Sequence, residues 1–400
     1  MKWEKVAIKD ICTGIYDGPH ATPPLSDTGA IFLGISNFKN GRLDFSDIRY
    51  ISEDDLPKWT KRVIPQKNDI VFSYEATLNL YAIIPEGFRG CLGRRMALLR
   101  VDETKADYKF LYYYFYSDAW RATVNENIVL GATVDRIPLI KFPDFPVELP
   151  PLETQHRIAD ILFAYDDLIE NNQKQIKLLE EAAQRLYKEW FVDLRFPGHE
   201  NTKIVDGVPE GWQWCKVRDV ADINSSALPK NYKEDFIDYV DLGSVRCGHI
   251  ETRTRYNLNE APGRAKRCAK DGDIIWGMVR PNLKAYALVT NPKETDVFST
   301  GFAVLSAKKV PYSYLYCAVT QEEFVGYLVN ATNGAAYPAV KPVHFEVADI
   351  LKPDDKVLEQ FHSVADSIYR KKEALENQNH NLRESRDLIL PKLMSGEVEV

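Results

Sequence analysis

Hydrophobic residues recur along this chain in two different periods. Short runs rich in β-branched and aromatic residues predict strands at 30–35, 69–74, 81–84 and 96–101, and again at 273–276, 285–290 and 301–306. Aromatic-rich segments follow at 107–127 and 311–330, and each predicts a helix. The clustered tyrosines of the first segment could stack on nucleic acid bases, but core packing is the commoner use of such density. The pattern predicts two mixed α/β modules with aromatic cores.

A heptad pattern follows each module. The first begins after Pro150 and Pro151, which are tolerated only at a helix start. Its expected seam residues are Ile158, Leu162, Tyr165, Ile169, Asn172, Ile176, Leu179, Leu186 and Trp190. The second helix keeps one apolar row, Phe361, Ile368, Leu375, Leu382 and Ile389, with Lys371, Gln378 and Ser385 at the alternate positions. We expect an antiparallel coiled coil with Asn172 and Gln378 in the seam; the alternative is two separate amphipathic helices.

The two modules are copies of one another, with a period of roughly 205 residues. Trp3 to Ile11 returns as Trp212 to Val220, and Ile158-Ala-Asp160 returns as Val364-Ala-Asp366. The predicted fold is therefore mixed α/β, with a pseudo-two-fold internal repeat. Two similar α/β domains are separated by two long α-helices that form the antiparallel coiled coil. The expected boundaries are domain 1 at 1–150, helix 1 at 151–194, domain 2 at 195–350, and helix 2 with a C-terminal tail at 351–400.

Composition and charge narrow the class of partner. The net charge is −7, but between Glu251 and Lys284 eight basic residues stand against four acidic ones. Such a local surplus can present a basic face to phosphate. The amino terminus has no apolar signal core, and no apolar run reaches the ~18 residues that span a bilayer. We therefore expect a cytoplasmic protein without a membrane partner, whose six scattered cysteines are reduced thiols.

Sequence motifs of catalysis are missing. Neither Gly-x-x-x-x-Gly-Lys-Ser/Thr nor Gly-x-Gly-x-x-Gly is present, so no ATPase or dinucleotide site is predicted. Asn291-Pro292 is followed by Lys293, which departs from an amino-methyltransferase tetrapeptide, and no histidine has metal-ligand spacing. We expect a binding protein that is not an enzyme and that holds no cofactor or metal of its own.

The candidate binding residues lie in two pairs of loops between predicted strands. In the second copy a guanidinium, a carboxamide and an ammonium share one hairpin, which suits guanine, adenine and phosphate respectively. The first copy carries different polar groups on what we expect to be the same frame. The predicted DNA contacts are Tyr74, Thr77, Asn79, Arg94, Arg95, Thr133 and Arg136 in the first copy, and Arg280, Asn282, Lys284, Tyr286, Tyr337 and Lys341 in the second.

Several segments resemble the specificity subunits of type I restriction-modification systems. They include the helix entry Leu149-Pro-Pro-Leu-Glu-Thr-Gln155, the exit Leu186-Tyr-Lys-Glu-Trp190-Phe191, the domain start Val208-Pro-Glu-Gly211-Trp212 and the terminal run from Leu382 to Glu397. The resemblance implies two target-recognition domains that read the halves of a bipartite double-stranded DNA site. It also implies docking of two modification (methyltransferase) subunits and of restriction (motor-nuclease) subunits, which would bind S-adenosylmethionine and ATP.

Two other readings remain open. One is a self-contained DNA methyltransferase or nuclease with diverged motifs, which activity of the purified chain alone would reveal. The other is an RNA-binding or purely architectural coiled-coil protein, which competition between duplex DNA and RNA would identify. A helix of ~35 residues is roughly 50 Å long, more than one turn of duplex, so the helical pair is suited to measure the distance between two DNA half-sites.

Overall fold

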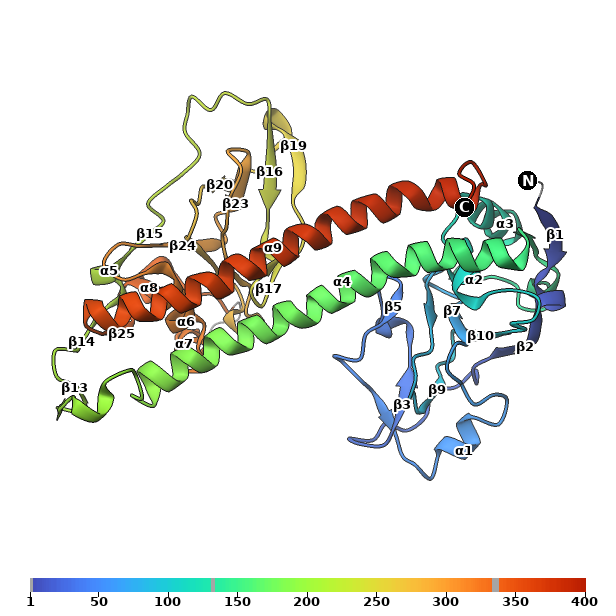
Figure 1. Cartoon of the computed structure of the whole chain (residues 1–400), viewed down its shortest axis with the longest axis horizontal. Helices are drawn as coiled ribbons and strands as arrows, with labels where there is room; N and C mark the ends of the chain where they lie inside the picture. The colour runs from blue at the N-terminus through green and yellow to red at the C-terminus, as the bar shows by residue number, and fades with distance from the viewer. Residues whose placement is uncertain (1–2, 131–133, 333–337) are drawn as a thin grey trace. The chain divides into compact units, whose positions relative to one another are not determined.

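The chain forms two compact units in the computed structural model, which describes residues 3–130, 134–332 and 338–400 (Figure 1). Unit 1 comprises Met1–Glu170 together with Asn379–Val400, and unit 2 comprises Asn171–Gln378. Each long helix contributes one part to each unit. The units therefore describe packing, whereas the four segments expected from the sequence describe the order of the chain.

Unit 1 is built on a four-stranded antiparallel sheet in the order β2-β10-β7-β8, next to a three-stranded sheet in the order β6-β3-β9, in which β3 and β9 are parallel. The first comprises β2 (Cys12–Asp17), β10 (Met96–Val101), β7 (Ile70–Ser73) and β8 (Tyr81–Ile83). The second comprises β6 (Tyr50–Ile51), β3 (Ala30–Leu33) and β9 (Gly90–Leu92). Two further pairs join β1 (Glu4–Ala7) to β11 (Pro146–Leu149) and β4 (Phe38–Lys39) to β5 (Arg42–Leu43).

Unit 2 repeats this topology. Its first sheet has the order β15-β24-β21-β22, with β15 (Ala221–Ile223), β24 (Phe302–Ala307), β21 (Ile274–Gly277) and β22 (Tyr286–Leu288). Its second has the order β19-β16-β23-β20, with β19 (Thr254–Asn257), β16 (Phe236–Val240), β23 (Asp296–Ser299) and β20 (Ala265–Arg267); β16 and β23 are parallel. The strand pairs are β14 (Gln213–Lys216) with β25 (Asp349–Lys352), β17 (Val245–Arg246) with β18 (His249–Ile250), and β12 (Ile204–Val205) with β13 (Val208–Pro209). The internal repeat is thereby confirmed, and every strand predicted from the sequence is present.

The prediction of one aromatic-rich helix per module is wrong, because each is two helices. Unit 1 has α2 (Tyr108–Tyr114) and α3 (Asp118–Asn127), and unit 2 has α6 (Tyr312–Thr320) and α7 (Glu322–Asn330). The break in unit 1 lies at Ser117, whose hydroxyl caps α3 by accepting a hydrogen bond from the Trp120 amide at 3.2 Å. Shorter helices are α1 (Leu56–Trp59), α5 (Val217–Val220) and α8 (Pro342–Glu346).

The aromatic residues of these helices form the cores, as predicted. Tyr112, Tyr113 and Tyr114 are buried, and Trp120 is fully buried against Phe115. Unit 2 places Tyr314 and Tyr316 in the corresponding core, which also contains Trp276. This packing leaves none of these rings free to stack on a base.

The two long helices pair antiparallel within each unit. Helix α4 covers Leu152–Tyr187 and is followed by a π-helical turn, Lys188–Val192; α9 covers Asp355–Met394. In unit 2 the Asn172 amide donates to Gln378 at 3.0 Å, and Glu180 pairs with Lys372 at 2.8 Å. In unit 1 Asp166 pairs with Arg386. Residue numbers rise along α4 as they fall along α9, so the predicted direction and the Asn172–Gln378 contact are confirmed.

The residues of the predicted seam are all buried or half-buried. Ile158, Leu162, Ile169, Asn172, Ile176, Phe361 and Leu375 are buried, and Tyr165, Leu179, Leu186, Trp190, Ile368, Leu382 and Ile389 are half-buried. Trp190 lies in the π-helical turn beyond α4. The alternate row of α9 was misplaced: Lys371 is exposed, and its neighbour Lys372 is buried. A straight helix turns every 3.6 residues, so its buried face drifts from a strict seven-residue row.

Candidate nucleic acid interface

In unit 1 the loop between β7 and β8 is held by the segment that follows α3. The Ala76 amide donates to the Asp135 carbonyl at 3.1 Å, and the Ile137 amide donates to the Tyr74 carbonyl at 2.8 Å. Glu75 and Arg136 form an isolated antiparallel bridge between them. The structure thus brings together two loops of unit 1 that both carry predicted contact residues and that lie far apart in the sequence.

Unit 2 holds its loop between β21 and β22 in the same way. The Arg280 amide donates to the Pro338 carbonyl and the Val340 amide donates to the Met278 carbonyl, both at 2.8 Å. Val279 and Ala339 form the equivalent bridge. The two loops of unit 2 that carry predicted contact residues therefore also meet.

The two loops share their unusual backbone conformations. In unit 1 Ala76 and Asn79 have positive φ angles of 71° and 61°, and in unit 2 Arg280 and Lys284 have 49° and 53°. Asn79 and Lys284 each lie two residues before the equivalent tyrosines that open β8 and β22. Non-glycine residues adopt this region rarely, so its occurrence at two matching places marks one inherited loop frame. The expectation of a common frame with different side chains is confirmed.

Several of the predicted contact residues present their side chains to solvent. Arg280 and Asn282 are exposed on either side of Pro281, at the start of the single 3-10 turn Pro281–Leu283. The other exposed members are Thr77, Arg94, Arg136 and Lys341. Their contact with DNA stays a prediction.

Other predicted residues are used inside the protein. Tyr74 is 4% exposed, and its hydroxyl donates to the Arg94 carbonyl at 2.9 Å. Arg95 lies 3.3 Å from the Glu75 carboxylate, and Lys284 pairs with Glu322. Asn79 is half-buried. These residues shape the loops, and in this conformation Tyr74 offers no group to a ligand.

Tyr286 lies at the base of the second loop. It is half-buried, with its ring centroid 5.6 Å from that of Trp276. Burial raises the pKa of its hydroxyl well above the ordinary value, and nearby acids add to the effect. Two more predicted contacts, Thr133 and Tyr337, lie outside the described residues.

The basic surplus counted between 251 and 284 is smaller in the folded chain. Arg255 donates to both carboxylate oxygens of Asp238, at 3.0 and 3.1 Å, and stacks over the Phe236 ring at 4.1 Å. Arg253 lies 3.3 Å from Asp296. Both acids come from strands outside the counted window, so a count along the sequence could not include them.

A hairpin links the second loop to both long helices. In the turn between β17 and β18, the Cys247 amide donates to the Lys284 carbonyl at 2.9 Å. The Gly248 carbonyl accepts from Lys372 Nζ of α9 at 2.7 Å. His249 Nδ1 donates to Glu376 of α9 at 2.7 Å, and its Nε2 lies 3.4 Å from Glu180 of α4. The candidate reading loop is therefore hydrogen-bonded to an element that is itself fixed to the helices.

The equivalent hairpin of unit 1 uses different groups. Arg42 follows the turn between β4 and β5 and pairs with Glu170 of α4, and the Gly41 carbonyl accepts from the Tyr112 hydroxyl at 2.8 Å. Gly41 and Gly248 have φ angles of +77° and +92°, and an added Cβ would lie 2.4 Å from Tyr112 Oη or 2.8 Å from Glu180 Oε1. Neither hairpin is among the site residues predicted from the sequence. The shared Gly followed by a basic residue was the signal available.

Hydrogen bonding favours the charged form of His249 near neutral pH, because it raises the pKa of the imidazole. Burial lowers the pKa of the imidazole, but hydrogen bonds to Glu180 and Glu376 outweigh burial and raise it to about 9. For Glu180 burial acts in the opposite direction and raises the pKa of the carboxyl, but interactions with His249 and Lys372 outweigh burial and hold this pKa below its ordinary value. The site is a compact group of two cations and two carboxylates.

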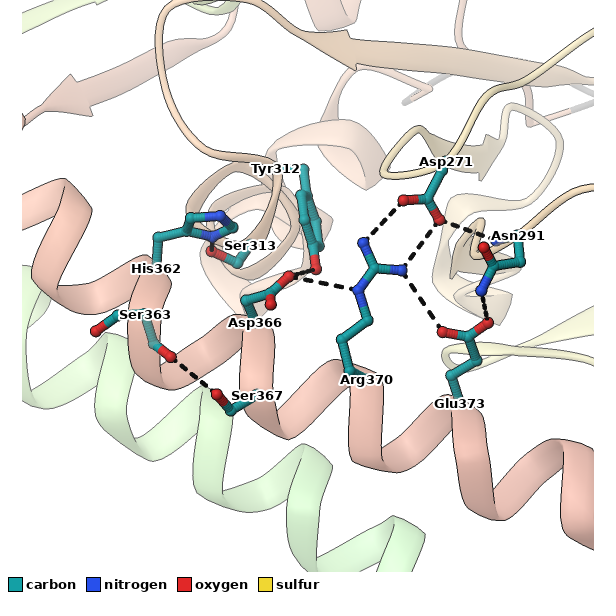
Figure 2. A network of polar contacts seen from close by, with 10 residues as sticks. All are labelled: Asp271, Asn291, Tyr312, Ser313, His362, Ser363, Asp366, Ser367, Arg370 and Glu373. Carbon is teal, nitrogen blue, oxygen red and sulfur yellow. Dashed lines mark hydrogen bonds and ion pairs between the residues drawn. The ribbon is translucent and has the colours of Figure 1, made fainter.

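Helix α9 also holds unit 2 through a polar network (Figure 2). The Arg370 guanidinium lies 2.8 Å from Asp271, which precedes β21, and 3.6 Å from Asp366 of its own helix. Asn291, after β22, donates to Glu373, and Tyr312 donates to Asp366. Arg370 and Glu373 thus contact the segments at both ends of the β21–β22 hairpin that carries the candidate loop.

Ser313 and His362, also in Figure 2, form a serine–histidine pair with 2.9 Å between Oγ and Nδ1. Ser313 is 0% exposed, so the contact joins α6 to α9 and offers no nucleophile to a substrate. Among residues 3–130, 134–332 and 338–400, no cluster of three or more His, Cys, Asp or Glu side chains could hold a metal ion. Within the same ranges, no helix is long and apolar enough to cross a bilayer.

Residues 1–181 match the family model of the type I restriction modification DNA specificity domain. The chain is 25% identical to the type I restriction enzyme MjaIX specificity subunit of Methanocaldococcus jannaschii, over 88% of this chain and 82% of the relative. It is 22% identical to the HindI specificity subunit of Haemophilus influenzae, over 67% of this chain and 72% of the relative. The crystal structure of the type I restriction-modification S subunit from M. genitalium has the same fold, with a TM-score of 0.59, 15% identity and coverage of 98% and 96% of the two chains.

Proposed function

We propose that this chain is the DNA specificity subunit of a type I restriction-modification complex and that each unit reads one half of a bipartite double-stranded site. The observation that carries the proposal is the pair of loops with one backbone frame and different exposed side chains. A duplicated frame presents its groups to DNA in the same way twice. The different exposed side chains of the two loops would then select different bases.

The side chains at the loop tips have the chemistry of base readout. Arg280 can bind guanine O6 and N7 as a bidentate donor, and Asn282 can bind adenine N6 and N7. Thr77 offers the first unit a hydroxyl in the corresponding loop. Exposed Arg94, Arg136 and Lys341 suit phosphate, which positions a protein on DNA without reading the sequence.

The paired helices would set the gap between half-sites and dock two modification (methyltransferase) subunits, with restriction subunits completing the complex. The division into target-recognition domains at 1–150 and 195–350 and spacer segments at 151–194 and 351–400 belongs to this proposal. S-adenosylmethionine and ATP would be bound by the partners, and a partner would flip the target adenines for methylation. The chain would act in the cytoplasm without chemistry of its own.

Methylome sequencing of cells with and without this chain tests the proposal. Its presence should add methylation at one two-part motif with a fixed number of unread base pairs. A hybrid whose loop 278–284 comes from another such subunit should change one half of the motif only. The purified chain should transfer no labelled methyl group to DNA by itself, and transfer would support the rival reading of a self-contained methyltransferase.

A further inference from the structure

An ion pair joins α4 to α9 in each unit. In unit 1 Asp166 of α4 lies 2.5 Å from Arg386 of α9. In unit 2 Glu180 of α4 lies 2.8 Å from Lys372 of α9. At both places, therefore, α4 supplies the acid and α9 supplies the base.

The four residues are related by the internal repeat. Ile158 and Asp160 correspond to Val364 and Asp366, a shift of 206 positions (158 to 364 and 160 to 366). The same shift relates Asp166 to Lys372 and Glu180 to Arg386. The two pairs are thus equivalent contacts in which every charge has been reversed between the copies.

This reversal makes each helix a poor partner for its own kind. In an antiparallel α4–α4 pair with the same register, Asp166 would face Glu180 of the second copy, acid against acid. In an α9–α9 pair, Lys372 would face Arg386, base against base. Only the α4–α9 pair matches opposite charges at both places.

A like-charge contact at these places would be strongly destabilising, because one member of each pair is buried. Asp166 is 7% exposed and Lys372 is 5% exposed, and removal of one partner from a buried pair leaves an uncompensated charge. Asp166 is fixed by the Tyr113 hydroxyl at 2.6 Å, and Lys372 by the Gly248 carbonyl at 2.7 Å, so neither can easily turn away from a like charge. Glu180 and Arg386, at 25% and 23% exposed, are the more accessible member of each pair.

The central polar contact does not make this distinction. Asn172 and Gln378 are themselves equivalent by the same shift (172 to 378), and an uncharged amide can pair with its own copy. Polar seam residues fix register, and flanking charges choose the partner. The choice between like and unlike helices therefore falls to the two ion pairs.

We infer that the reversed charges on α4 and α9 are a pairing code that selects the other helix of the same chain and rejects the matching helix of a second copy. The code goes beyond DNA reading. It favours one chain with two different recognition units over two chains joined through identical halves, because like charges disfavour the wrong helix pair, as they do in coiled coils.

Exchanging the two accessible charges tests the code in the full chain. In E180K/R386E, each α4–α9 contact becomes a like-charge pair, whereas α4–α4 and α9–α9 contacts become opposite-charge pairs. Asp166 and Lys372 keep their other hydrogen bonds. We expect this variant to form species of two or more chains by light scattering, with a melting temperature that rises with protein concentration. The wild type should have the mass of one chain.

Two controls separate the code from general damage. E180Q/R386Q removes the charges without reversing them and should keep the one-chain mass. D166K/E180K/K372E/R386E carries the same two substitutions but exchanges all four charges, so that opposite charges again meet only between α4 and α9, and it should regain the one-chain mass. At protein concentrations low enough for E180K/R386E to remain a single chain, its melting temperature should lie about 5–10 °C below that of the wild type.

Three results would overturn the inference. The first is a wild type that cross-links through α4 to α4. The second is an E180K/R386E variant that stays one chain and melts no lower than E180Q/R386Q. The third is a D166K/E180K/K372E/R386E variant that associates as E180K/R386E does. Should E180K/R386E precipitate, the melting temperatures of the single variants E180K and R386E decide, because each should fall below the matching Gln variant.

Discussion

The two units share the strand order of their first sheet and the parallel pair in their second, yet they are fastened to the long helices by different chemistry. Unit 1 uses a half-exposed Arg42–Glu170 pair on its hairpin, whereas unit 2 uses buried Lys372 with His249 and two carboxylates. Unit 2 adds the Arg370 network on α9. The repeat has therefore preserved the place where each unit contacts the helices, but not the side chains that make the contact. The two units should respond differently to mutation and to pH.

The largest expected effect is the loss of Lys372. Lys372→Ala leaves Glu180 and the Gly248 carbonyl without their cation in a buried place, and should lower the free energy of unfolding by about 3 kcal/mol. Urea unfolding measures it. Lys371→Ala is the matched control, since Lys371 is exposed on the same helix and should change stability by less than about 0.5 kcal/mol. Equal losses in the two variants would contradict a buried attachment.

Exchange of base-reading groups should affect one half-site only. Arg280→Ala or Asn282→Ala should weaken discrimination at the half-site of unit 2 by about 1–3 kcal/mol per lost bidentate pair, and leave the other half-site unchanged. Binding to a set of single-base variants measures this. Thr77→Ala is the counterpart that should alter the half-site of unit 1. Uniform weakening on every sequence would mean that these groups contact phosphate.

The hairpin of unit 2 should weaken as pH rises. His249 has a folded-state pKa raised to about 9, so its stabilisation is fully present below the ordinary value of 6.5 and is lost as pH rises through 9. The expected loss is about 1–2 kcal/mol, less than the full shift implies because the side chain is 36% exposed.

His249→Arg sharpens this test, because it copies the charge that Arg42 supplies to unit 1 and does not titrate in this range. Stability measured between pH 6 and pH 10 should lose the His249-dependent slope in the variant. An unchanged slope would assign the pH dependence to another group.

The smallest effect is expected in the hairpin of unit 1. Both side chains of the Arg42–Glu170 pair are 40% exposed, so water screens the attraction. Arg42→Ala should lower the free energy of unfolding by about 0.5 kcal/mol in the same urea measurement. A loss as large as that of Lys372→Ala would remove the proposed difference between the attachments.

The sequence by itself determined the parts whose pattern is local or repeated. Short apolar runs located β7, β10, β21 and β24, the heptads located α4 and α9, and the duplicated segments established that the topology occurs twice. Asn172 and Gln378 could be paired in advance because both lie at seam positions, and a seam admits few alternatives. The equivalence of the two reading loops followed from their places between equivalent strands.

Only the tertiary structure decided which charges are free. Arg253 and Arg255 belong to the basic stretch, but acids on distant strands neutralise them, and Lys284 is taken by Glu322. Tyr74 is predicted from the sequence to contact DNA, but in the structure it is buried and its hydroxyl donates to the Arg94 carbonyl. Lys372 is buried and Lys371 is exposed, because neighbouring residues on a helix point in different directions and only one of them faces the core. Burial and ion pairing depend on groups that lie between 17 and 124 positions apart in these examples, and periodicity along the chain carries no record of such contacts.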